Sequence, residues 1–62
     1  MKKGLYENKL GVKIEVFDFN TDVFGNKYLT WRWCDDGKSY NVLVESFKGM
    51  IKANHYKLIE ER

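Results

Sequence analysis

An Asp36-Gly37 turn signal lies between two segments in which apolar and polar residues alternate, residues 28–34 and 39–45. Asp and Gly both tolerate the positive φ that a two-residue type I′ turn requires at its central positions. Alternation with a period of two is typical of a strand with one buried face. The stretch therefore predicts a β-hairpin, and this hairpin restricts the fold more than any other part of the chain.

The turn also predicts which residues face each other across the hairpin. The expected apolar pairs are Trp33 with Tyr40, Trp31 with Val42, and Leu29 with Val44. The expected opposite face carries Tyr28, Thr30, Arg32 and Asn41 among its residues. A slip of one residue would mix the two faces, so the turn chemistry and the hydrophobic pattern agree on this separation.

The segment before the hairpin predicts a further strand. Val12, Ile14 and Val16 alternate with polar residues and are expected to face the core. Phe17 and Phe19 then fall on the polar positions, so we expect either a bulge near Phe17 or a strand end that is covered on both faces. Residues 1–11 are expected to form an N-terminal arm or a short extra strand.

The segment after the hairpin predicts a helix over residues 46–60, with Ser46 as its N-cap. Tyr56 and Ile59 would lie outside the core-facing stripe of that helix. The expected fold class is therefore α+β, in a single domain over residues 1–62. It consists of a three-stranded antiparallel meander, residues 12–45, packed against one C-terminal helix.

The chain length limits the stability of such a fold. A domain of 62 residues buries only about 60% of the surface that its unfolded chain exposes. The single cysteine excludes an internal disulfide, and Cys34 with His55 is a poor set of metal ligands, so no metal or cofactor is expected. Aromatic residues make up 16% of the chain, more than so small a core readily hides. We therefore expect a homodimer that buries part of them.

No arrangement of residues for catalysis is visible. Turn formation explains the neighbouring carboxylates Asp35 and Asp36. His55 has no Ser, Cys or acid at a useful spacing, so a packed or half-exposed histidine is expected instead of a catalytic one. Cys34 shares a face with Arg32, which can lower a thiol pKa, but a small residue opposite Ser39 is the simpler interpretation. We expect that the protein is not an enzyme.

Composition bears on the compartment and the partners. The net charge of +2 comes from 11 basic and 9 acidic residues that are interspersed, a pattern that favours solubility over binding to a polyanion. No apolar segment approaches the ~20 residues of a membrane span, and no apolar region follows the basic start, so we expect a cytoplasmic protein. Abundant Lys, Asn, Tyr, Phe and Ile without Pro suits an AT-rich genome, such as that of a low-GC bacterium or its phage.

These observations predict a small binding protein that acts by protein–protein contact. Its size, its excess of aromatic residues and its lack of catalytic signatures are typical of accessory, inhibitor or modulator proteins of phages and mobile elements, which act on a host protein. The expected interface of the homodimer uses Tyr56 and Ile59 from the helix, with Phe24 or Phe19 from the end of the sheet. Each of these side chains contributes ~1.5–3 kcal/mol when fully removed from water.

The alternative function is a small nucleic-acid-binding domain. A helix on one side of the sheet would leave the other side open, and this open face would present Tyr28, Thr30, Arg32 and Asn41. These residue types can contact bases or backbone. Glu15 and Glu45 are expected on the same face with few lysines, which weakens the electrostatic attraction for phosphate.

Overall fold

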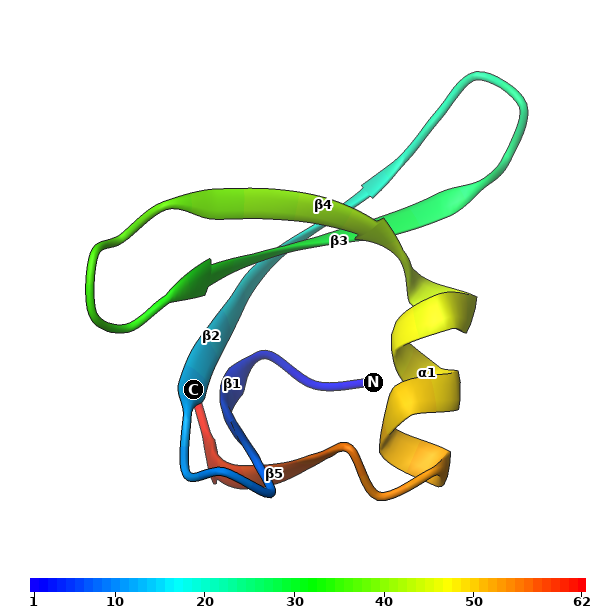
Figure 1. The fold of residues 1–62 in the computed structure, drawn as a ribbon. Coiled ribbons are helices and arrows are strands. Elements are labelled where there is room, and N and C mark those ends of the chain that lie inside the picture. Colours follow the sequence, from blue (N-terminus) through cyan, green and yellow to red (C-terminus); the bar gives the residue numbers. More distant parts are fainter.

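A computed structural model of the protein describes residues 1–62 as five strands and one helix. The elements, in chain order, are β1 (Gly4–Asn8), β2 (Lys13–Thr21), β3 (Lys27–Trp33), β4 (Ser39–Leu43), α1 (Val44–Lys52) and β5 (Tyr56–Glu61). All strand pairs are antiparallel, and the order across the sheet is β4-β3-β2-β1-β5. The sheet is strongly bent, so that β3 and β4 lie over β1 and β5 while α1 packs against one end (Figure 1).

The α+β class is confirmed, but the expected three-stranded sheet is wrong. The short N-terminal strand, foreseen as one of two alternatives, forms β1 and pairs with β2. The fifth strand was not foreseen, because residues 56–61 were expected to continue the helix. β5 pairs with β1 and places the two ends of the chain side by side, since the amide of Arg62 donates to the carbonyl of Lys3 at 3.0 Å.

Of the two alternatives expected for the end of β2, the bulge near Phe17 is confirmed. Val16 pairs with Trp31, but Asp18 pairs with Thr30, so Phe17 is an extra residue on its strand. Because a bulge changes which side chains face the core, Phe19 becomes half-buried against the core. Phe17 instead lies on the other face, where its ring centroid is 4.6 Å from the guanidinium carbon of Arg32.

The β3–β4 hairpin forms, but its predicted register is wrong by two residues. Trp31 pairs with Tyr40, and the amide of Trp33 donates to the carbonyl of Lys38 at 3.0 Å. The connection is therefore a four-residue loop, residues 34–37, instead of a two-residue turn. In that loop Gly37 has a φ of +74°, whereas Asp36 does not have the positive φ that a type I′ turn requires. Since side chains alternate with a period of two, a shift of two residues keeps each side chain of β3 and β4 on its predicted face. Val44 and Glu45, which were expected in the second strand, instead begin α1.

The helix is displaced from its predicted range of 46–60. It begins earlier, so that Ser46 lies inside it and Leu43 is the N-cap residue, without a side-chain hydrogen bond. It ends after Lys52, because Asn54 adopts a left-handed conformation with a φ of +63° and the amide of His55 donates to the carbonyl of Met50 at 2.8 Å. This is the conformation with which many helices end. The chain beyond it is extended and forms β5.

The core lies between the concave side of the bent sheet and α1. Its six buried apolar residues come from β1, β2, β3 and α1, and they are Tyr6, Ile14, Val16, Leu29, Val44 and Phe47. The Trp residues of β3 are only half-buried, and they pack on each other with ring centroids 4.9 Å apart, beyond the part of the sheet that the helix covers. The core is therefore small, and much of the aromatic surface lies at its rim.

Candidate functional site

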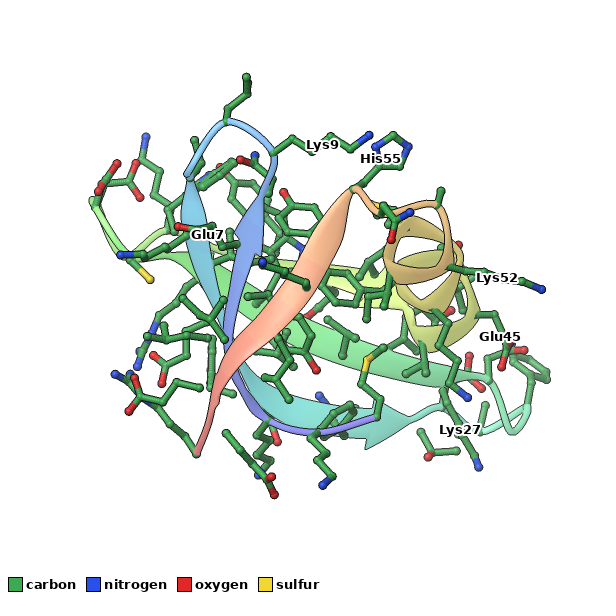
Figure 2. All side chains as sticks on the ribbon, turned by 90° about the horizontal axis from the view of Figure 1, so that it is seen from below. Glu7, Lys9, Lys27, Glu45, Lys52 and His55 are labelled. Carbon is green, nitrogen blue, oxygen red and sulfur yellow. The ribbon has the colours of Figure 1, made fainter.

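The loop between β2 and β3 exposes two large apolar side chains that are neighbours in the chain. Val23 is 92% exposed and Phe24 is 87% exposed. The hairpin that carries them extends away from the rest of the molecule (Figure 1), and Lys27 at its base lies near this loop (Figure 2). Neither side chain contributes to the core, so the molecule gains no stability from their apolar surface.

The backbone of this loop is held by Asp22. One carboxylate oxygen, Oδ1, accepts from the amides of Phe24 and Asn26, both at 2.9 Å, and Oδ2 accepts from Asn26 Nδ2 at 3.1 Å. Partial desolvation raises the pKa of Asp22, but these hydrogen bonds from Asn26 and Phe24 outweigh it and hold the pKa below its ordinary value. Gly25 closes the loop with a φ of +85°. The two apolar side chains thus stand on an ordered turn.

A shallow pocket lies at the base of the same hairpin, with a volume of about 270 Å³. Its apolar lining includes Phe19, Tyr28 and Val44, and two of its polar lining residues are Lys27 and Lys48. The pocket and the exposed loop therefore belong to one end of the molecule. An apolar group with a negative charge beside it would match the chemistry of this lining.

The four residues predicted for a dimer interface do not share one surface. Tyr56 packs against the core, with its ring stacked on that of Phe47 at a centroid distance of 5.6 Å. Phe19 also packs against the core, whereas Phe24 and Ile59, which is 41% exposed, lie on separate elements. Because residues 56–61 form β5, the predicted position of Tyr56 and Ile59 on the outside of a helix is wrong. The homodimer itself stays a prediction.

The convex face of the sheet carries an ion-pair cluster centred on Glu15. Its Oε1 accepts from Arg32 Nε at 2.9 Å and from Arg32 Nη2 at 2.7 Å, and its Oε2 lies 3.3 Å from Arg62 Nη1. The hydrogen bonds from Arg32, followed by the contribution of Arg62, hold the pKa of the Glu15 carboxyl below its ordinary value against partial desolvation. The Glu15 side chain is only 18% exposed. The guanidinium groups of Arg32 and Arg62 compensate its charge.

The structure brings the residues of the predicted nucleic-acid face together on this convex side. Thr30 and Asn41 are cross-strand partners, and Thr30 Oγ1 donates to Asn41 Oδ1 at 2.7 Å. Tyr28 follows on the same side of β3 and is half-buried. Arg32, however, already uses two donors on Glu15. Its charge is therefore partly neutralised before any phosphate approaches.

Sequence reasoning missed Arg62 and the pairing of Glu15 with Arg32. Glu15 and Arg32 were both expected on this face, but only the register of β2 against β3 shows that they are opposite each other. Arg62 was not considered, because a helix over 46–60 gave no reason to bring the C-terminal residues to the sheet. Apolar and polar residues do not alternate over residues 58–62, so the sequence contains no clear signal for a strand there.

The other polar residues singled out by sequence do not meet. Cys34 is exposed in the β3–β4 loop, and Asp36 Oδ1 accepts from the amide of Lys38 at 2.9 Å, which is the turn role expected of it. His55 follows the helix and lies beside Lys9 (Figure 2). No three His, Cys, Asp or Glu side chains lie close enough together to hold a metal ion.

The fold and this surface define a small α+β protein with an exposed apolar loop and a charged convex face. No protein-family model, curated protein or solved structure matches the chain. The helix α1 is neither long enough nor apolar enough to cross a membrane.

Proposed function

We propose that this chain is a non-enzymatic binding protein that acts by protein–protein contact, as an accessory, inhibitor or modulator of its partner. The observation that carries the proposal is the exposure of Val23 and Phe24, 92% and 87%, on a loop whose backbone is ordered by Asp22. Ordering the loop before binding reduces the entropy that association costs. At protein interfaces a few buried side chains, aromatic ones prominent among them, supply most of the binding energy.

The pocket at the base of the hairpin supports the same surface. Its apolar lining with Lys27 and Lys48 suits a partner that presents an apolar side chain next to a carboxylate. We propose that the partner receives Phe24 in an apolar recess and places such a group in the pocket. Two contacts about one hairpin would also fix the orientation of the partner.

A photocrosslinking experiment tests this function. The phenyl ketone benzoylphenylalanine, placed at position 24, should capture one protein from a low-GC bacterial lysate, and mass spectrometry should identify it. Leu10, also 87% exposed but located in the β1–β2 turn, provides a matched control position. Capture from position 24 and not from position 10 is expected. The proposal fails if the two positions capture the same proteins.

The purified partner then allows a quantitative comparison. Val23→Ser with Phe24→Ser should weaken its binding at least about tenfold, since loss of a central aromatic contact costs roughly 2 kcal/mol or more. Leu10→Ser should leave the affinity unchanged, because it removes an equally exposed apolar side chain elsewhere. Equal effects of the two changes would show that the β2–β3 loop has no special role.

A second proposal is nucleic-acid binding by the convex face around Arg32 and Asn41. The observation in its favour is a surface depression lined by three cations, Lys13, Arg32 and Arg62, and a single carboxylate, Glu15. Binding through phosphates releases counterions and is therefore strongest at low salt. Duplex and single-stranded DNA should bind at low salt and lose affinity when Arg32 is changed to Ala. Absence of binding at low salt removes this function.

The setting of the protein is part of the proposal. We infer a cytoplasmic site of action, supported by a lone exposed thiol, Cys34, which suits a reducing compartment. The proline-free, Lys- and Asn-rich composition supports an origin in a low-GC bacterium, its phage or a mobile element, with a host protein as the partner.

A further inference from the structure

The sheet has two edges, and they differ in how well they are protected. β5 carries the charged residues Lys57, Glu60 and Glu61, and Ile59 forms a bulge because Leu58 and Glu60 pair with consecutive residues of β1. Charged side chains and bulges are the devices with which proteins prevent an edge strand from pairing with another chain. One edge of this sheet is thus protected twice.

The other edge, β4, has neither device. Its five residues, Ser39–Leu43, contain no charge and no proline, and they pair with β3 without a register shift. Neither α1 nor a loop covers its outer side: Tyr40 is 45% exposed and Leu43 is 42% exposed. This strand is a regular, uncharged edge that is open to solvent.

The outward backbone groups of β4 follow from its pairing with β3. The hydrogen bond from the Trp33 amide to the Lys38 carbonyl makes this a hydrogen-bonded pair. In antiparallel sheets hydrogen-bonded pairs alternate with non-hydrogen-bonded pairs. The pairs Trp31–Tyr40 and Leu29–Val42 are therefore hydrogen-bonded, and the backbone groups of Tyr40 and Val42 point toward β3. Those of Ser39 and Asn41 point away from the sheet. They form a ladder without a partner in the chain.

We propose that β4 pairs antiparallel with β4 of a second copy of this chain, about a two-fold axis at Asn41. Each Asn41 then exchanges both backbone hydrogen bonds with its symmetry mate, and each Tyr40 lies beside Val42 of the other copy. The two five-stranded sheets join into one of ten strands. An isologous contact of this kind closes after two copies and does not extend into a fibre.

The charges that flank β4 favour a second copy in this orientation. Lys38 precedes the strand, and Glu45 follows it in the first turn of α1. The side chain of Glu45 is 88% exposed, and its Oε1 lies 3.8 Å from Lys48 Nζ. Antiparallel pairing about Asn41 places Lys38 opposite Val44 and next to Glu45 of the other copy, once at each end of the contact. Parallel pairing would instead bring like charges together at both ends.

This contact does not use the β2–β3 loop, so it is independent of the proposed function. Five residues of strand form a small interface, well below the ~1,600 Å² of a standard protein complex. We therefore expect association in the micromolar range or weaker, promoted by high protein concentration.

Disulfide trapping tests the pairing and its register. In a Cys34→Ser background, which removes the only thiol, Asn41→Cys places two cysteines at the axis with Cα atoms about 5.5 Å apart. That separation is within the range of a disulfide. Ser39→Cys is the matched control, because its two copies would be four residues apart along the strands, about 13 Å. Under mild oxidation, Asn41→Cys should cross-link at least about tenfold faster, as expected from the effective concentration in the dimer.

A charge exchange provides a second test that needs no cysteine. In sedimentation velocity of the parent protein at high concentration, a dimer of the 7.4 kDa chain is expected. Lys38→Glu should shift it toward monomer, and the double change Lys38→Glu with Glu45→Lys should restore the dimer. The proposal is overturned if the parent stays monomeric at all concentrations, if larger species dominate, or if the Ser39 and Asn41 cysteines cross-link at equal rates.

Discussion

The ring of Tyr6 meets the ring of Phe47 edge to face, with centroids 5.3 Å apart and planes at 87°. Tyr6 is 2% exposed and Phe47 is 1% exposed, so this contact joins β1 to α1 at the centre of the core. The Tyr6 hydroxyl remains satisfied, because it donates to the carbonyl of Lys2 at 2.6 Å. One aromatic pair therefore connects the beginning of the sheet with the only helix.

Phe47→Ala should remove most of the stability of the protein. Removing a buried Phe costs about 3–5 kcal/mol, which is comparable with the ~5 kcal/mol total stability expected of so small a domain. Urea unfolding followed by circular dichroism measures the change. Phe24→Ala is the control, since it removes the same ring from an exposed site and should alter the free energy of unfolding by less than about 0.5 kcal/mol. A normal unfolding midpoint for Phe47→Ala would contradict this core.

Gly4→Ala and Gly49→Ala should have opposite effects on stability. A Cβ at position 4 would overlap the backbone carbonyl oxygen of Glu60, so β1 and β5 would have to separate. A Cβ at position 49 meets nothing and lies in a helix, where Ala is favoured over Gly by up to about 1 kcal/mol. Thermal unfolding should show a lower midpoint for the first variant and a higher one for the second. A harmless Gly4→Ala would show that the two strands do not approach so closely.

Glu15 should make stability depend on pH in the acid range. Its pKa is lowered in the folded state by the hydrogen bonds from Arg32, so the stabilisation is complete above the ordinary glutamate pKa of about 4.3. It is lost as the pH falls through the lower folded-state pKa. Glu15→Gln should therefore be less stable than the parent at neutral pH. The loss should be at most about 1 kcal/mol, because the side chain of Arg32 is 45% exposed and solvent weakens the ion pair.

The two curves of stability against pH should converge at acid pH, because Glu15 is then protonated in the parent. The pKa of Asp22 is also lowered in the folded state, but Asp22 is present in both proteins and its effect cancels in the comparison. A difference that stays constant down to about pH 2, below the range in which carboxylates usually titrate, would mean that the Glu15→Gln change acts through packing and not through the missing charge.

Asp22→Ala should loosen the β2–β3 loop without unfolding the sheet. It removes the acceptor for the amides of Phe24 and Asn26, which should then exchange with deuterium faster. Asp35→Ala in the β3–β4 loop is the control, since no hydrogen bond involves the Asp35 side chain. Exchange is followed residue by residue by NMR. Unchanged protection of the two amides would show that the loop is ordered by something else.

Side-chain alternation predicted the faces of the hairpin correctly, although the turn did not predict its register. Trp31 pairs with Tyr40 where Val42 was expected, yet both candidates belong to the same face. The preference of Asp36-Gly37 for a two-residue turn did not decide the register. The chain forms a four-residue loop instead, in which Gly37 alone adopts a positive φ. The bulge at Phe17 was predictable because it appears as a break in the alternation.

The error at the C-terminal end has a different origin. A helical period could be read through residues 47–58, and local pattern alone cannot exclude a helix there. What makes residues 56–61 a strand is pairing with β1, a contact between opposite ends of the chain. Asn54 carried the one local signal, because asparagine tolerates the left-handed conformation that ends the helix. The position of Arg62 beside Glu15 depends on the pairing of β5 with β1, so it could not be predicted while residues 56–61 were expected to be helical.

The pairing of β1 with β5 also bears on how the protein folds during synthesis. Gly4 pairs with Glu61, so β1 leaves the ribosome long before its outer partner exists. Until then the growing chain can form only the β1–β2–β3–β4 part of its sheet, with β1 as a temporary edge. Contacts between such distant residues carry a high cost of loop closure and slow the final step. A chain truncated after residue 55, which lacks β5, should therefore be far more sensitive to protease than the full chain.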